Sequence, residues 1–274
     1  MKTISRGWEF VKLTMFDQSL ADYLTRFKYF ADRFDHISRH RTELERLVDD
    51  YSTFITDESN SNIWDGLERQ GTGGLNGLAE ELRACSARCV ATLEKYRALK
   101  LIKGDTGITD YFRNIEECIE KEFGSFQVTS KSIVLLVGSG AFPMTALLIA
   151  KRTGAEVIGI DIDDEAIGLG VKVIEALGPE LKIRLINTPV ENLDYIQEVT
   201  HIIFSSTVAE KYDMLERLHP LTNEEVVVAM RHGNRLKSLF NYPMKETDDD
   251  KWKLVDTVLR QNDIFDIALY KKAP

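Results

Sequence analysis

The chain has 274 residues, of which 43% are hydrophobic and 29% are charged, and its formal net charge is −9. This length and composition indicate a globular protein with one large domain or two modest ones. The acidic balance opposes general nucleic-acid binding, which needs clustered Lys and Arg to neutralise phosphates.

No apolar run reaches the roughly 18 residues that a membrane helix needs, and the N-terminal segment lacks the pattern of a cleaved leader. We therefore expect a cytoplasmic protein whose partner is a small molecule. The three cysteines, Cys85, Cys89 and Cys118, are too few for a disulfide framework, and Cys85 and Cys89 have helical spacing. Buried thiols are expected, and no metal site.

Helical periodicity dominates the first part of the chain. Apolar residues recur every three or four positions over residues 19–55 and again over residues 78–102. The glycine-containing stretch 56–76 is expected to be a connecting loop, and a further helix is expected over residues 111–123. The pattern predicts an N-terminal helical-bundle domain over residues 1–127, which would cover the substrate.

Short apolar runs rich in β-branched residues follow, and segments of helical character separate most of them. Such runs are typical of strands that are buried on both faces, and the alternation predicts a doubly wound, Rossmann-like α/β sheet over residues 128–274. The runs are SIVLLV (132–137), EVIGID (156–161), KIRLIN (182–187), THIIFS (200–205), EVVVAM (225–230) and DIALYK (266–271).

The first run leads directly into a glycine-containing turn before the next helix. Glycines at such a turn let the backbone approach a ligand, and the helix start offers free N–H groups. Asp161 ends the second run, where a carboxylate can accept hydrogen bonds from ribose hydroxyls. Turn and acid together predict a nucleoside cofactor. The turn is formed by Gly138, Ser139, Gly140, Ala141, Phe142 and Pro143.

Pro143 favours one class of nucleoside cofactor over another. A dinucleotide site normally has a third glycine at this place, so that helix and strand pack closely around a pyrophosphate. S-adenosylmethionine (SAM) has no pyrophosphate and tolerates the proline. A turn that only packs the sheet is the alternative reading.

Polar residues follow the other expected strands. Asp163 lies two residues beyond Asp161, and Asn187 follows the third run, where it is a candidate for bordering the adenine. Ser205 and Ser206 follow the fourth run and are candidates for lining the cofactor pocket, although small hydroxyl residues also cap helices.

Several segments resemble the catalytic core of the nicotianamine synthases, and more closely that of their bacterial relatives, the staphylopine-type opine metallophore synthases. The chain is shorter than the plant enzymes and lacks their GPLPLT turn. The resemblance extends over residues 47–272, through DDYSTFI (49–55), CVATLEKYRALKLIKG (89–104), TDYFRNIEECIEKEFG (109–124), VGSGAFPMTALLIAKRTGAEVIGIDID (137–163), HIIFSST (201–207) and VVVAMRHGNRLKSLFNYP (226–243).

The resemblance implies an enzyme that transfers the aminobutanoyl (3-amino-3-carboxypropyl) group of SAM to the α-amine of histidine and releases 5'-methylthioadenosine. SAM is then a co-substrate, no catalytic metal is needed, and L- and D-histidine are alternative acceptors. A partner opine dehydrogenase would complete the metallophore. One alternative is a SAM-dependent small-molecule N-methyltransferase, but SSTV replaces the NPPY-like tetrapeptide of amine methyltransferases after the fourth run. The other alternative is a non-enzymatic nucleotide-binding or regulatory module.

The resemblance also implies site residues in the helical part. Glu94 matches the catalytic glutamate of these enzymes, and the alternative reading is a solvated glutamate paired with Arg97 or Lys95. Tyr111 matches a tyrosine that borders the reacting centre, and Asn114 is a possible polar partner there.

Three further candidates follow the fifth run, within the segment that resembles the family's RSAHG and LYP elements. Arg231 is expected in the loop after the strand, where it would hold a carboxylate of SAM or of the acceptor. His232 is a candidate general base or substrate-binding residue, and Tyr242 a candidate substrate-binding residue.

Overall fold

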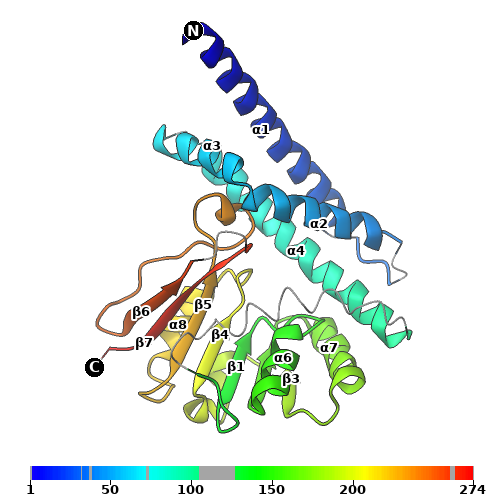
Figure 1. Cartoon of the computed structure of the whole chain (residues 1–274). Coiled ribbons are helices and arrows are strands. Elements are labelled where there is room, and N and C mark those ends of the chain that lie inside the picture. Colours follow the sequence, from blue (N-terminus) through cyan, green and yellow to red (C-terminus); the bar gives the residue numbers. More distant parts are fainter. Residues whose placement is uncertain are drawn as a thin grey trace. The chain divides into compact units, whose positions relative to one another are not determined.

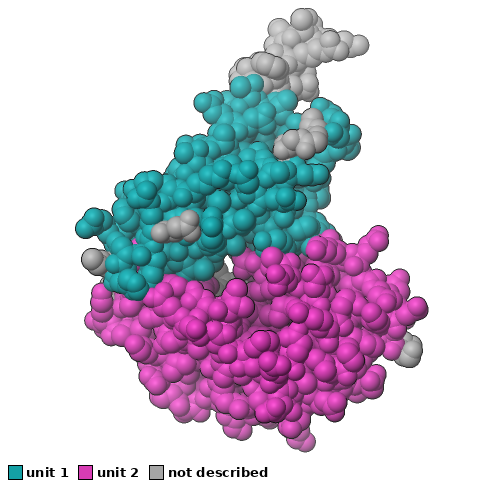
Figure 2. All heavy atoms as spheres, turned by 180° about the vertical axis from the view of Figure 1, so that it is seen from behind, with its two compact units in different colours: residues 1–93, 233–243, 261–264 teal, residues 94–232, 244–260, 265–274 magenta. Residues whose placement is uncertain are grey.

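The computed structural model describes residues 2–31, 33–36, 39–71, 74–104, 127–259 and 263–273 (Figure 1). The chain forms two compact units, which Figure 2 shows in different colours. Unit 1 comprises residues 1–93, 233–243 and 261–264, and unit 2 comprises residues 94–232, 244–260 and 265–274. The domain boundary expected at 127/128 stays a prediction, and the helix expected over 111–123 lies outside the described residues.

Unit 1 is helical. One helix lies within the stretch that was expected to be a loop, so that expectation was wrong. Asp57 caps this helix, since its carboxylate accepts the N–H of Asn60 at 2.9 Å, and Trp64 and Leu67 are buried on one face. The helices are α1 (Lys2–Phe30), α2 (Arg41–Thr56), α3 (Glu58–Arg69) and α4 (Gly74–Ile102), of which residues 74–93 belong to this unit.

The segment after the fifth strand packs into unit 1. It contains the short helix η3 (Arg235–Leu239), and the buried Tyr51 of α2 donates its hydroxyl proton to the carbonyl of Leu239 at 2.9 Å. Arg83 of α4 donates from Nε to the carbonyl of Ser238 at 2.7 Å. These bonds satisfy backbone carbonyls that the short helix leaves free, and they fix the segment to the helices.

Unit 2 is built on a seven-stranded sheet with the order β3-β2-β1-β4-β5-β7-β6. The first five strands are parallel and β7 is antiparallel to both of its neighbours, which confirms the expected doubly wound α/β fold. The strands are β1 (Ile133–Val137), β2 (Glu156–Ile160), β3 (Ile183–Ile186), β4 (His201–Phe204), β5 (Val227–His232), β6 (Trp252–Val258) and β7 (Asp266–Lys272).

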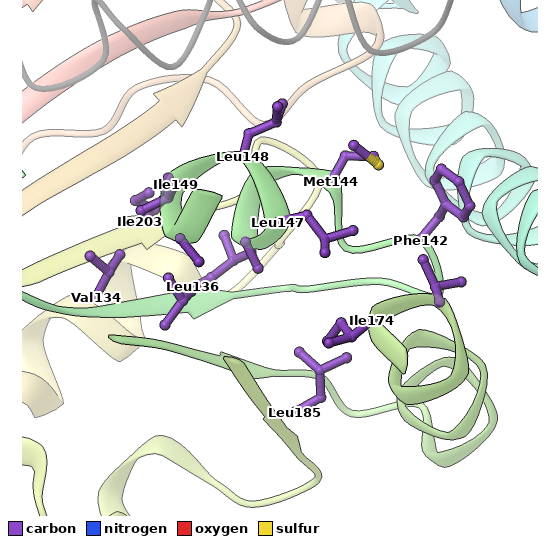
Figure 3. Packing of buried hydrophobic residues seen from close by; sticks show 14 of the residues in the cluster. Val134, Leu136, Phe142, Met144, Leu147, Leu148, Ile149, Ile174, Leu185 and Ile203 are labelled. Carbon is purple, nitrogen blue, oxygen red and sulfur yellow. The ribbon is translucent and has the colours of Figure 1, made fainter. Parts of the chain in front are cut away.

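Helices cover the sheet, and successive residues of its strands enter different hydrophobic clusters. The first cluster holds Val134 and Leu136 of β1 with residues of α6 and α7 (Figure 3). The second cluster holds Leu135 and Val137 with residues of α8. This alternation follows from the two-residue period of a strand, and it explains why the runs are apolar throughout. The helices are α6 (Met144–Thr153), α7 (Asp164–Leu177) and α8 (Lys211–Leu218).

Residues 94–102 of α4 also belong to unit 2, and Ala98 is part of the first cluster. The edge strand β6 was not expected, because most of its residues are exposed and it therefore lacks an apolar run. Among the described helices, none has a segment long and apolar enough to cross a membrane.

Candidate active site

The site begins at the carboxyl end of β1, where the chain turns towards α6. Gly138 and Gly140 have φ angles of 81° and 68°, a region that favours glycine. The N–H groups of Gly138 and Ser139 both donate to the carbonyl of Ile160, at 2.9 and 3.0 Å. The N–H of Gly140 donates to Oδ2 of Asp161 at 2.9 Å. The turn is thus fastened to the end of β2.

Asp161 and Asp163 organise the carboxyl end of β2. Oδ1 of Asp161 accepts the N–H of Asp163 at 3.1 Å, so each oxygen of Asp161 accepts one backbone bond and keeps capacity for another. Asp163 is the N-cap of α7, and its Oδ1 accepts the N–H groups of Glu165 and Ala166. Asp161 is therefore held in place and still able to bind a hydroxyl.

Glu94 lies against the turn. A Cβ atom at Gly140 would overlap with Oε2 of Glu94, so any other residue would require this carboxyl group to move. Burial raises the pKa of Glu94 to about 8, and the charge of Asp161 acts in the same direction, whereas Arg97 and the N–H of Ala141 oppose the shift. A carboxyl group with such a pKa can both hold and release a proton near neutral pH.

Lys95, the neighbour of Glu94, has other partners. Its Nζ lies 2.7 Å from Oδ2 of Asp163 and 2.6 Å from Oε2 of Glu165. In the alternative reading of Glu94, Lys95 was one of two possible ion-pair partners, but its ammonium is directed to the start of α7. Arg97 does act on Glu94 electrostatically.

The turn after β4 meets the turn after β1. Oγ of Ser205 donates to the carbonyl of Gly138 at 2.9 Å, and a Cβ atom at Gly138 would lie 3.1 Å from Cβ of Ser205. Ser206 is buried, and its carbonyl accepts a hydrogen bond from Nζ of Lys211 at 3.3 Å. In the strand order, β1 lies between β2 and β4, and this position is where open α/β sheets bind ligands.

Arg231 and His232 are the last two residues of β5, so the expectation that Arg231 lies in the following loop was wrong: its pairing with β7 extends the strand. Arg231 is 8% exposed and donates from Nη1 to Oγ1 of Thr145 at 3.2 Å. Its guanidinium lies 5.1 Å from the centre of the Phe265 ring. His232 is 1% exposed. A buried guanidinium is therefore held beside the first turn of α6.

The remaining cofactor candidates lie around this site. Phe142 is 3% exposed and belongs to the first hydrophobic cluster (Figure 3), and Pro143 is the N-cap residue of α6. The hydroxyl of Ser139 is buried without a hydrogen-bond partner in the described part of the chain. Asn187 donates from its amide to Oδ1 of Asp164 at 2.5 Å, at the start of α7.

The other candidate substrate-binding residues lie outside unit 2 or outside the described residues. Tyr242 belongs to unit 1, where the Arg83 guanidinium lies 5.2 Å from the centre of its ring. Tyr111 and Asn114 lie outside the described residues.

Three residues of the site had not been singled out for it from the sequence: Thr145, Lys95 and Lys211. Lys211 is 0% exposed, and its Nζ also donates to the carbonyl of Arg231 at 2.6 Å, joining the ends of β4 and β5. In the sequence it reads as an ordinary surface lysine at the start of a helix, and no local signal distinguishes it. Within the ranges that the structure describes, no group of three or more His, Cys, Asp or Glu side chains could hold a metal ion.

Two similar proteins from different bacteria carry the same name. The chain is 27% identical over 230 residues to an L-histidine 2-aminobutanoyltransferase of Pseudomonas aeruginosa, and the match covers 84% of this chain and 86% of that protein. It is 32% identical over 174 residues to a protein of the same name from Yersinia pestis, with 63% and 65% covered. No protein-family model matches the chain.

Solved structures show the same fold. The crystal structure of MtNAS in complex with MTA and tNA superposes with a TM-score of 0.76 at 19% identity, covering 94% of this chain and 98% of that one. An MtNAS glutamate-to-glutamine mutant in complex with S-adenosylmethionine gives a TM-score of 0.72 at 18% identity, covering 92% and 98%. MtNAS is a nicotianamine synthase. The comparisons confirm the resemblance that the sequence segments indicated.

Proposed function

We propose that this protein transfers the aminobutanoyl group of SAM to the α-amine of histidine and releases 5'-methylthioadenosine. One observation of the structure carries the proposal: the Glu94 carboxyl group, with its pKa near 8, lies directly against the turn expected to bind the nucleoside. The curated relatives, named for this transfer to L-histidine, support the same reaction.

The turn after β1 fits SAM better than a dinucleotide. The N–H groups of Gly138, Ser139 and Gly140 already donate to Ile160 and Asp161. A pyrophosphate needs several free N–H groups at this place, whereas SAM needs none of them for a phosphate. Asp161 keeps acceptor capacity for the ribose hydroxyls, so the donor can be held through its nucleoside part.

The chemistry requires an uncharged amine. Its nitrogen lone pair attacks Cγ of the methionine part of SAM, and the Cγ–S bond breaks with its electrons passing to sulfur. The positive sulfonium thereby becomes a neutral thioether, which needs no proton to leave. The nitrogen becomes cationic and must lose a proton. With a pKa of about 8, Glu94 lies much nearer to the pKa of an amine than an ordinary carboxyl group does, so the proton can pass to it at a lower cost.

The acceptor is held through its carboxylate in this proposal. The buried guanidinium of Arg231 offers paired N–H groups of the kind that bind carboxylates. His232, Tyr111 and Asn114 are proposed to complete the acceptor site, and Tyr242 stays a candidate substrate-binding residue. We also propose a cytoplasmic location and a partner dehydrogenase that acts on the product.

The test is mass spectrometry of the purified protein with SAM and either enantiomer of histidine. We expect 5'-methylthioadenosine together with a histidine adduct that is one aminobutanoyl unit heavier. The Glu94→Gln variant should still bind SAM in calorimetry but form the adduct about 100-fold to 10,000-fold more slowly, the usual contribution of a general base. S-adenosylhomocysteine as the product would instead identify a methyltransferase and refute the proposal.

A further inference from the structure

Two consecutive residues of α4 carry opposite charges and reach different parts of unit 2. Glu94 lies against the turn that follows β1, whereas Lys95 contacts the start of α7, which follows β2. The end of α4 is therefore attached to the carboxyl ends of two neighbouring strands. The proposed reaction uses only Glu94.

The contacts of Lys95 are close, and the lysine side chain is more sheltered than its two partners. Its ammonium lies 2.7 Å from Asp163 and 2.6 Å from Glu165, and its side chain is 13% exposed. Burial alone would lower the pKa of Lys95, but the hydrogen bonds to the two carboxylates outweigh burial and raise it. One cation shared by two carboxylates is held more strongly than an isolated surface ion pair, because each partner limits its motion and water is partly excluded.

Hydrogen bonds connect Asp163 to the turn that follows β1. The N–H of Asp163 donates to Asp161, whose other oxygen accepts the N–H of Gly140, and Gly140 lies under the Glu94 carboxyl group. Glu94 and Lys95 are adjacent in the chain, so the contacts form a closed ring.

We propose that Lys95 is a positioning residue: by fixing the end of α4 to Asp163 and Glu165, it holds the Glu94 carboxyl group against the turn at Gly140. The catalytic role of Glu94 rests on the proposed function. The role of Lys95 concerns only the location of the Glu94 carboxyl group, which can be tested without the reaction. Without the ammonium, the end of α4 loses its polar contact with α7 and Glu94 becomes more exposed to water.

The expected consequence concerns the acidity of Glu94. Among the residues that the structure describes, three groups act on this carboxyl group besides burial: Asp161 after β2, Arg97 on α4 and the N–H of Ala141 in the turn. Burial has the largest effect, so a carboxyl group that moves towards water should return towards its ordinary pKa.

The experiment is an NMR titration of the full-length protein with ¹³C-labelled glutamate, in which Glu94→Gln assigns the Glu94 signal. In Lys95→Gln we expect the pKa of Glu94 to fall by one unit or more. Asp163→Asn removes one of the two ion pairs and should lower it by less, and Lys95→Arg should restore most of it. The matched control is Lys103→Gln, which removes an exposed lysine beyond the end of the same helix. In the control, the pKa of Glu94 should not move.

Enzyme kinetics give a second readout. In Lys95→Gln, kcat should fall about tenfold, with the KM for SAM changed less than threefold, and the rise of kcat with pH should shift to lower pH. Should Lys95→Gln not fold, Glu165→Gln removes one of the two ion pairs and should give a smaller shift in the same direction. An unchanged Glu94 pKa in every folded variant at Lys95, Asp163 and Glu165 would overturn the positioning role.

The titration needs neither SAM nor histidine. A wild-type protein that forms no aminobutanoyl product would refute the proposed function, while the titration would still decide whether Lys95 positions Glu94. Normal product formation with an unmoved Glu94 pKa would refute the positioning role alone.

Discussion

Replacing Glu94 by glutamine should change how the stability of the protein depends on pH. The folded protein holds a proton on Glu94 up to a pH of about 8, whereas the unfolded chain releases it near the ordinary value of 4.5. The favourable contribution of this group is therefore complete below pH 4.5 and is lost as the pH rises towards 8. Glutamine has the shape of the protonated acid and does not titrate, so the variant loses this dependence.

The size of the effect follows from the shift. Each pKa unit corresponds to about 1.4 kcal/mol, so a pKa near 8 instead of 4.5 places the upper limit near 5 kcal/mol. Glu94 is partly exposed, and screening by water reduces the difference to roughly 2–5 kcal/mol. Between pH 4.5 and pH 9, the free energy of unfolding of the variant should rise by this amount relative to that of the wild type. Most of the rise should occur below pH 8.

Urea denaturation of both proteins at intervals of half a pH unit measures the difference directly. The free energies of unfolding should diverge steadily over this range and become parallel above it. Two curves that stay parallel from pH 4.5 to pH 9 would show that Glu94 ionises as readily in the fold as in water, and would remove the physical basis for its function as a base.

Three further substitutions test other parts of the site. Gly140→Ala should lower the free energy of unfolding by about 2 kcal/mol or more and abolish product formation. Alanine is strained at a φ of 68°, and its Cβ would overlap with the Glu94 carboxyl group. The control variant Gly168→Ala, at a position where space is open, should be neutral or slightly stabilising. Lys211→Met should lower the free energy of unfolding, measured by urea denaturation, by about 1–3 kcal/mol, because two buried carbonyls lose their hydrogen-bond donor. Lys172 is exposed, so an equal loss in Lys172→Met would contradict this explanation. Arg231→Lys should raise the KM for SAM or for the acceptor at least tenfold in steady-state kinetics, because an ammonium cannot reproduce paired guanidinium bonds, and two unchanged KM values would exclude carboxylate binding.

The sequence predicted those parts of unit 2 whose signals are local. The apolar runs, the turn at Gly138 and the acid at Asp161 lie within short segments, and each has a physical reason that can be recognised without the fold. The proximity of Glu94 to that turn was suggested by a resemblance, since nothing in its own helix indicates burial.

Other features depend on distant contacts and could not be predicted in this way. Lys95 and Glu165 are separated by 70 positions in the chain, and Lys211 lies 20 positions from the carbonyl of Arg231 that it binds. Helix α3 was missed because its polar composition resembles a loop, and its stability depends on the Asp57 cap and on two buried apolar side chains. Strand β6 was missed because an edge strand with exposed faces shows no apolar run.

The path of the chain between the two units has a consequence for biosynthesis. Tyr51 is made early, but the carbonyl that accepts its hydroxyl proton belongs to Leu239, in a segment that follows β5. While the ribosome is still making the sheet, the N-terminal helices lack this hydrogen-bond partner. Unit 1 can reach its final packing only after nearly the whole polypeptide has emerged, so a fragment that ends before residue 233 should leave the ribosome with its first helices unfinished.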